Sequence, residues 1–181
     1  MNVPNILTLI RLILIPCFVL FFYLPFDLAH IVAAMIFLIA AFTDFLDGFL
    51  ARKLNMETRL GQFLDPVVDK LMIATALVLL VNIYHHIDVV LCSIVMISRE
   101  ILISALREWM SEIGKRGIVA VSWIGKFKTF TQMVAITGLI LFQSHVDSTL
   151  YYIALYALYI ATLLTIISML NYLYVAKNEL R

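Results

Sequence analysis

Apolar residues fill six long segments of the chain, and short stretches containing Pro, Gly or His separate them. Each segment has about the 20 mostly apolar residues that a transmembrane helix needs. The pattern predicts an all-α, polytopic integral membrane protein with six transmembrane helices, built as a single domain over residues 1–181. The expected spans cover residues 4–24, 29–50, 63–84, 88–109, 119–143 and 149–175.

The composition supports this interpretation. Hydrophobic residues make up 64% of the 181 residues, whereas a soluble globular domain is about 45–50% apolar. The mean hydropathy is +1.03, which excludes an ordinary soluble enzyme. The net charge of +1 identifies no partner by itself. We expect membrane lipids as neighbours and no nucleic acid.

The cations lie on one side of the predicted membrane. The loops after the first, third and fifth spans contain no Lys or Arg, and the 13 Lys and Arg residues fall toward the other side. Because cytoplasmic segments are rich in these residues, this side and both chain termini are predicted to be cytoplasmic. Trp109, Tyr172 and Tyr174 are expected to form an aromatic belt there, and Gln132 is expected to hydrogen-bond between helices.

Two pairs of aspartates lie at the cytoplasmic ends of the second and third spans. Asp44 and Asp47 are three residues apart, and Asp65 and Asp69 are four apart, so each pair occupies one face of its helix. A carboxylate within a membrane is costly unless something pairs with it. Four carboxylates that face each other across one helical hairpin, joined by a turn from Lys53 to Gly61, form an all-oxygen site that suits Mg²⁺ or Mn²⁺.

The residues between the aspartates favour phosphate chemistry. Gly48 and Ala51 leave the backbone accessible, and Arg52 is able to bind a phosphate with two parallel hydrogen bonds. Metals, a cation and open backbone are what phosphoryl transfer requires. Ion transport is the alternative use of aspartates within a membrane.

The fourth and fifth spans carry more positive charge than a neutral acceptor needs. Arg99 and Arg107 are eight residues apart on one helix face, which suits an acceptor that bears a phosphate. Two alternatives stay open: the glutamates on the same helix pair with these cations, or some of the cations anchor the protein at the headgroups. The further cations are Lys115, Arg116, Lys126 and Lys128, and the glutamates are Glu100, Glu108 and Glu112.

The stretch from Asp44 to Asp69 matches D-x2-D-G-x2-A-R-x8-G-x3-D-x3-D at every specified position. With this signature the chain resembles the CDP-alcohol phosphatidyltransferases. Three further segments are similar to one branch of that family, the bacterial phosphatidylglycerophosphate synthases. They are N-V-P-N-I-L-T-L-I-R-L near the N-terminus, Ser98 to Trp109, and Val119 to Thr129.

The resemblance implies transfer of a phosphatidyl group from CDP-diacylglycerol to sn-glycerol 3-phosphate, with release of CMP. It further implies that the four aspartates hold two divalent cations and that Asp69 is the general base. It also implies a homodimer in the bacterial inner membrane, with its active site on the cytoplasmic side. The residues it assigns to CDP-diacylglycerol are Gly48, Ala51, Arg52 and Thr58, helped by Asn5, Thr8 and Arg11.

Two other functions compete with this one. A sister enzyme would use another acceptor, such as inositol phosphate or a second lipid. A divalent-cation transporter would use the aspartates as an ion path, but transporters normally carry polar residues across the full membrane depth, and here the charges stop on one side. Ala33-Ala34 and Gly138 are candidates for packing in an interface between copies.

Overall fold

The computed structural model describes residues 3–54, 59–114 and 123–179, with side chains except at residues 3–5, 44–54, 59–60, 62–63, 123–126 and 178–179. These described residues form six α-helices and no strand, which confirms the all-α class. The helices are α1 (Val3–Tyr23), α2 (Ala29–Leu54), α3 (Arg59–Tyr84), α4 (Ile87–Glu112), α5 (Trp123–Leu141) and α6 (Thr149–Glu179).

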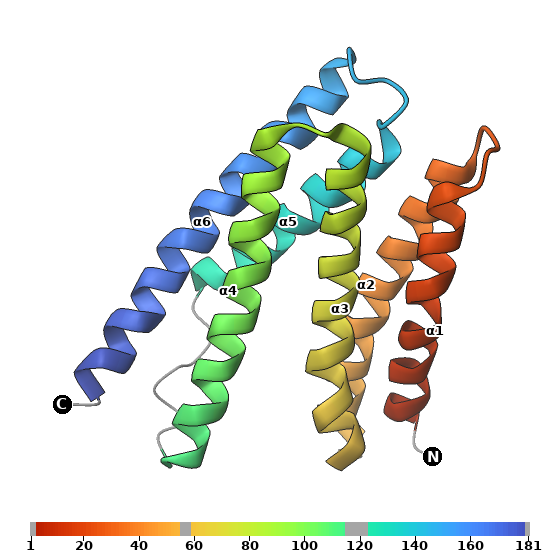
Figure 1. Ribbon diagram of the computed structural model, residues 1–181. Coiled ribbons are helices and arrows are strands. Elements are labelled where there is room, and N and C mark those ends of the chain that lie inside the picture. The colour runs from red at the N-terminus through yellow and green to blue at the C-terminus, as the bar shows by residue number, and fades with distance from the viewer. Residues whose placement is uncertain (1–2, 55–58, 115–122, 180–181) are drawn as a thin grey trace.

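The helices run up and down as three antiparallel pairs (Figure 1). The connections after α1, α3 and α5 lie at the upper end of the view, whereas α1 begins and α6 ends at the lower end. Helix α1 packs on α2 and α3, and α5 packs on α6 and α2. The lower ends of α2, α3 and α4 therefore share one end of the molecule with both chain ends, as the charge pattern requires.

Four helices are long and apolar enough to cross a membrane: the spans are Ile6–Tyr23, Leu64–Tyr84, Ile87–Glu112 and Thr149–Lys177. Helices α2 and α5 contribute shorter apolar stretches, Ala29–Thr43 and Phe127–Leu141. These stretches stop where the charged residues of the two helices begin. Many large apolar side chains are exposed on the outside of the bundle, as expected for a membrane protein whose neighbours are lipid tails.

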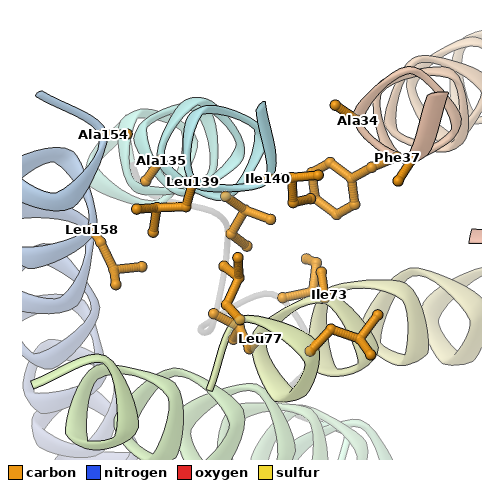
Figure 2. Close-up of a cluster of buried hydrophobic side chains, with 14 of the residues drawn as sticks. Ala34, Phe37, Ile73, Leu77, Ala135, Leu139, Ile140, Ala154 and Leu158 are labelled. Atoms are coloured by element: carbon orange, nitrogen blue, oxygen red, sulfur yellow. The ribbon is translucent and has the colours of Figure 1, made fainter. Parts of the chain in front are cut away.

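The core lies where the three pairs meet. Figure 2 shows Leu139 and Ile140 of α5 between side chains of α2, α3 and α6. Phe37, Leu77 and Leu158 from those three helices are each at most 1% exposed. Helix α5 therefore holds the bundle together, because its apolar face contacts both the first and the last pair.

Small residues allow the closest helix contacts, but within the chain. A Cβ atom added to Gly138 would lie 2.7 Å from Cβ of Ala154, so α5 and α6 approach too closely for a side chain there. Ala33 and Ala34 are at most 1% exposed and belong to the core. The prediction that these residues form an interface between copies is therefore wrong, because their surface is already used inside the bundle.

The connection between α2 and α3 is shorter than the predicted turn. Helix α2 continues through Leu54 and α3 begins at Arg59, so most of the stretch from Lys53 to Gly61 is helical, and residues 55–58 lie outside the described residues. Gly61 stands within α3, and Pro66 comes seven residues after the start of that helix. Both helices therefore extend past the ends of their apolar runs.

Candidate active site

Asp65 of α3 is bound by two polar residues of α1. Thr8 Oγ1 donates a hydrogen bond to Asp65 Oδ1, and Arg11 Nη2 lies 3.6 Å from the same oxygen. Thr8 and Arg11 are 1% and 2% exposed. The two residues are three positions apart and so share the face of α1 that packs on α3. In a mostly apolar helix, their burial is accounted for by the carboxylate that they bind.

Asp69 lies one turn further along α3, beside a small pocket between helices. Arg11 of α1, Ala40 and Ala41 of α2, and Met133 of α5 also line this pocket. Lys70, the next residue after Asp69, donates a hydrogen bond to Ser104 of α4 instead, as expected for a side chain about 100° around the helix. Asp69 therefore faces the region between α1, α2 and α5.

The other two aspartates follow on α2. Asp44 comes four residues after Ala40, one helical turn beyond the pocket that Asp69 lines, and Asp47 comes one further turn along. Their side chains lie outside the described ones. Among the side chains that the structure describes, no three His, Cys, Asp or Glu residues converge as a metal site. The described half of the predicted set, two carboxylates one turn apart on α3, fits a hard divalent cation.

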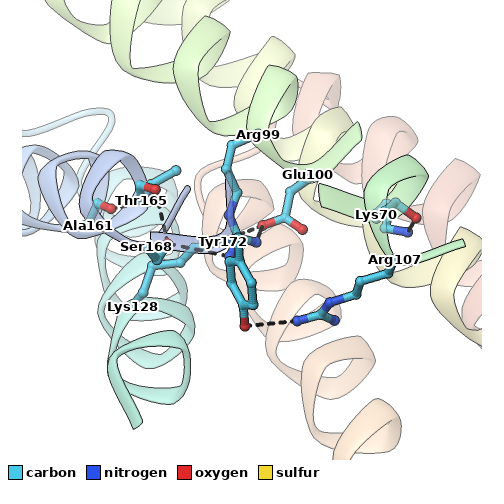
Figure 3. A network of polar contacts seen from close by, with 10 residues as sticks. Lys70, Arg99, Glu100, Arg107, Lys128, Ala161, Thr165, Ser168 and Tyr172 are labelled. Atoms are coloured by element: carbon cyan, nitrogen blue, oxygen red, sulfur yellow. Dashed lines mark hydrogen bonds and ion pairs between the residues drawn. The ribbon is translucent and has the colours of Figure 1, made fainter. Parts of the chain in front are cut away.

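A second polar cluster joins α4, α5 and α6 (Figure 3). Arg99 and Arg107 of α4 point to the same side and flank Tyr172 of α6, with guanidinium carbons 5.7 and 5.3 Å from the ring centroid. Arg107 Nη2 donates to Tyr172 Oη at 3.0 Å, and Arg99 Nη2 donates to Ser168 Oγ at 3.4 Å. The predicted common face of the two arginines is confirmed.

Tyr172 is not part of an aromatic belt. It is 6% exposed and packs with its ring against both arginines, so the prediction for this residue is wrong. The ring face attracts the guanidinium groups electrostatically, which outweighs the preference of Tyr for the membrane boundary. Trp109 and Tyr174 remain exposed, at 47% and 67%.

Glu100 forms ion pairs with two cations of this cluster, Arg99 and Lys128. Its Oε1 atom accepts hydrogen bonds from Arg99 Nη1 at 3.1 Å and from Lys128 Nζ of α5. Of the glutamates considered as partners, this one contacts the cations. Lys128 is 2% exposed, so it does not anchor the chain among lipid headgroups. The ammonium group of Lys128 also interacts electrostatically with Asp69, which links the two polar clusters.

Sequence reasoning named Lys128 as an acceptor-binding cation or a headgroup anchor and Glu100 as a possible partner of the cations, but it did not consider Ser168. The spacing of Arg99, Lys128 and Ser168 along three different helices gives no signal that they meet. Gln132, one turn deeper than Lys128, is 1% exposed, and neither atom of its amide has a hydrogen-bond partner among the described residues. Its predicted role in bonding between helices is therefore not confirmed.

The structure describes only part of the predicted site. The backbones of Gly48, Ala51 and Arg52 continue α2, that of Asn5 belongs to α1 and that of Lys126 to α5, but their side chains lie outside the described ones. The predictions for Thr58, Lys115 and Arg116 fall outside the described residues altogether.

A family model described as CDP-alcohol phosphatidyltransferase matches residues 1–171. The chain belongs to this family. The match includes the first polar cluster and the second as far as Ser168 of α6, and ends one residue before Tyr172. The signature on α2 and α3 is thus accompanied by a match over nearly the whole described bundle.

Curated relatives match the chain along its full length. A protein of Sodalis glossinidius is 53% identical over 180 residues, which are 99% of this chain and 97% of that protein. One of Salmonella paratyphi A is 55% identical over 179 residues, with coverage of 99% and 97%. One of Haemophilus influenzae is 51% identical over 180 residues, with coverage of 99% and 95%. Each is named CDP-diacylglycerol–glycerol-3-phosphate 3-phosphatidyltransferase.

Proposed function

We propose that the chain is an integral membrane enzyme that transfers the phosphatidyl group of CDP-diacylglycerol to sn-glycerol 3-phosphate. The products are phosphatidylglycerol phosphate and CMP. The observation that carries the proposal is the complete signature from Asp44 to Asp69, in a chain more than half identical over its full length to relatives named for this reaction.

The aspartate side of the site is assigned to two divalent cations, Mg²⁺ or Mn²⁺. Asp44, Asp47, Asp65 and Asp69 would hold them. Asp65 contacts α1, and Asp69 lines a pocket together with residues of α1, α2 and α5. When bound, the cations would neutralise the phosphate oxygens and stabilise the charge that develops during transfer. Thr8 and Arg11 fix the orientation of Asp65 through their contacts with Oδ1, as residues behind a metal ligand do.

Asp69 is assigned as the general base. It would accept the proton from the acceptor hydroxyl as the hydroxyl oxygen attacks the phosphorus atom and CMP leaves. The pocket beside Asp69 contains the side chain of Arg11, a residue that was assigned to CDP-diacylglycerol. Gly48, Ala51, Arg52, Thr58, Asn5 and Thr8 complete that assignment.

The cluster on α4, α5 and α6 is assigned to the phosphate of the acceptor. Arg99 is the residue best placed for it, because it is 7% exposed and its Nε has no hydrogen-bond partner among the described residues. A buried donor left without an acceptor costs about 1–3 kcal/mol, and an oxyanion of the acceptor would remove that cost. Arg107 lies beside Arg99 across Tyr172, and Lys126, Lys115 and Arg116 complete the assignment.

The charge pattern and the up-and-down arrangement support the proposed placement in the membrane. We assign six spans to one domain in a bacterial inner membrane, with both termini and the active site on the cytoplasmic side. The α1 start and α6 end share one end of the bundle (Figure 1). A homodimer remains part of the proposal, with an interface that does not use Gly138 or Ala33-Ala34.

The test is a CMP-release assay on the purified protein with CDP-diacylglycerol and Mg²⁺. Glycerol 3-phosphate, inositol phosphate, serine and no acceptor are compared in parallel, each with and without EDTA. We expect release with glycerol 3-phosphate alone, abolished by EDTA. Release with another acceptor would reassign the cluster on α4 while keeping the aspartate chemistry. Release that survives EDTA would contradict the metal assignment.

A further inference from the structure

We propose that Glu100 is a positioning residue that holds the Lys128 ammonium away from Asp69 and thereby preserves the affinity of the aspartates for divalent cations. The inference rests on the proposed function through its metal site. Glu100 itself contacts neither the aspartates nor the proposed substrates. Its effect would pass through Lys128, which interacts with the carboxylates of both Glu100 and Asp69.

Lys128 contacts one carboxylate, that of Glu100, and is attracted by a second, that of Asp69, on helix α3. Its Nζ atom donates a hydrogen bond to Glu100 Oε1, and the same ammonium group is attracted by Asp69. The Lys128 side chain is 3% exposed, so water compensates little of its charge. An ammonium group in such surroundings requires a carboxylate partner. If Glu100 lost its charge, Asp69 would be the remaining carboxylate known to act on Lys128.

The negative charge of Glu100 also lowers the net positive charge of the cluster. Arg99 Nη1 shares Oε1 of Glu100 with Lys128, and Arg99 also repels Lys128. The three side chains together carry one net positive charge. Without the carboxylate they would carry two, next to a site assigned to divalent cations. Both consequences, competition by Lys128 for Asp69 and repulsion of the incoming metal, weaken metal binding.

The expected size follows from Coulomb's law. One uncompensated unit charge at roughly 10 Å from a divalent cation, with an effective dielectric constant near 20 and ionic screening over about one Debye length, changes a binding constant about tenfold. Glu100→Gln keeps the shape and one acceptor oxygen but removes the charge. We therefore expect about tenfold weaker Mn²⁺ binding in Glu100→Gln, with a matching rise in the Mg²⁺ concentration needed for half-maximal activity.

The experiment is a Mn²⁺ titration of the purified, detergent-solubilised full chain, followed by the loss of the electron paramagnetic resonance signal of free Mn²⁺. It compares wild type, Glu100→Gln, Lys128→Met and the double variant Glu100→Gln/Lys128→Met. Glu108→Gln serves as the matched control, because Glu108 is an exposed glutamate on the same helix. The control is expected to bind Mn²⁺ as the wild type does.

The double variant separates positioning from a merely structural role. If Glu100 acts by holding Lys128, removing the lysine charge restores Mn²⁺ affinity to within about threefold of wild type, and Lys128→Met alone binds Mn²⁺ at least as tightly as wild type. If Glu100 only stabilises the helix packing, the double variant binds no better than Glu100→Gln. Lys128→Met and the double variant keep the test valid even if Glu100→Gln fails to fold, because neither leaves a buried ammonium without its carboxylate.

Three outcomes overturn the inference: Glu100→Gln binds Mn²⁺ like wild type, the double variant shows no recovery, or Lys128→Met binds Mn²⁺ more weakly. A wild type that binds no Mn²⁺ overturns both the inference and the metal assignment. The titration contains no substrate, so its result is independent of the reaction. If the variants bind Mn²⁺ as expected but the wild type releases no CMP, the proposed function is rejected and the role of Glu100 stands.

Discussion

The two polar clusters differ in the sign of their charge. The first cluster joins two carboxylates of α3, Asp65 and Asp69, with the cation Arg11 of α1. The second cluster joins three cations, Arg99, Arg107 and Lys128, with the carboxylate of Glu100. Each cluster tolerates burial because it contains a minority charge of the opposite sign. The surplus shows what each is suited to bind, a cation in the first and an anion in the second.

The clusters also differ in how their residues are held. Asp65 is held by two side chains of a neighbouring helix that reach one oxygen atom. Arg99 is held from three directions, by Glu100, by Ser168 and by the ring of Tyr172. A group that binds a metal needs free lone pairs, whereas a guanidinium group that binds a phosphate needs free donors and a fixed plane. Variants on each side should therefore impair different substrates.

The largest effect is expected at Asp69. Asp69→Asn keeps the size of the side chain but removes the charge and the proton acceptor, so we expect the CMP-release rate to fall about a thousandfold. Size-exclusion chromatography and the thermal unfolding midpoint check that the variant still folds. Turnover close to wild type in a folded variant would contradict the base assignment.

Arg99→Ala tests the cationic side of the comparison. Truncating one member of a buried, hydrogen-bonded charge pair typically costs 2–5 kcal/mol, so kcat/KM for glycerol 3-phosphate should fall about a hundredfold. The KM for CDP-diacylglycerol should stay near the wild-type value, which separates this variant from a general loss of structure. Arg99→Lys keeps the charge without the planar guanidinium and is expected to lose less. If the dependence on glycerol 3-phosphate does not change, the acceptor phosphate binds elsewhere.

Thr8→Val tests whether α1 orients the acidic side. The substitution removes the hydroxyl that donates to Asp65 at nearly constant volume, and the loss of a residue behind a metal ligand should raise the Mg²⁺ requirement about tenfold. The matched control is Thr131→Val on α5, whose hydroxyl bonds only to a carbonyl of its own helix among the bonds described. An equal effect of both substitutions would show that hydroxyl loss in a helix, not the contact with Asp65, is responsible.

The smallest effect is expected for Tyr172→Phe. The ring stays against both arginines, but Arg107 loses the oxygen that accepts its hydrogen bond at 3.0 Å. A neutral acceptor of this kind contributes about 1 kcal/mol, which predicts a KM for glycerol 3-phosphate about fivefold higher. Tyr156→Phe, at a 62% exposed position on the same helix, is the control. An unchanged KM in Tyr172→Phe would indicate that Arg107 does not contribute to acceptor binding.

Helices and their order are predictable from this sequence because each apolar run is long enough to specify one element. The predicted spans end within a few residues of the helices at most positions, and the error between Lys53 and Gly61 has a local cause. The polar residues there have the composition of a turn, but both helices continue beyond their apolar residues. Hydrogen bonds between backbone groups form a helix whether or not its side chains are apolar.

Part of the candidate site was also predictable. Asp65 and Asp69 share a helix face by spacing alone, as Arg99 and Arg107 do. The partners of these residues were not predictable in the same way. Thr8 was assigned to a substrate and found on Asp65, and Tyr172 was assigned to the membrane boundary and found between two arginines. Each contact joins residues far apart in the chain, where spacing carries no information.

The sequence by itself determined the helices, the side of the membrane on which the charges gather, and the residues that share a face of one helix. These features follow from hydrophobicity and from the 3.6-residue period of the helix, which are local properties. Only the tertiary structure decided which faces meet: Asp65 against Thr8, and Glu100 between Arg99 and Lys128. That choice depends on how the apolar surfaces of all the helices pack together, and no single segment contains it.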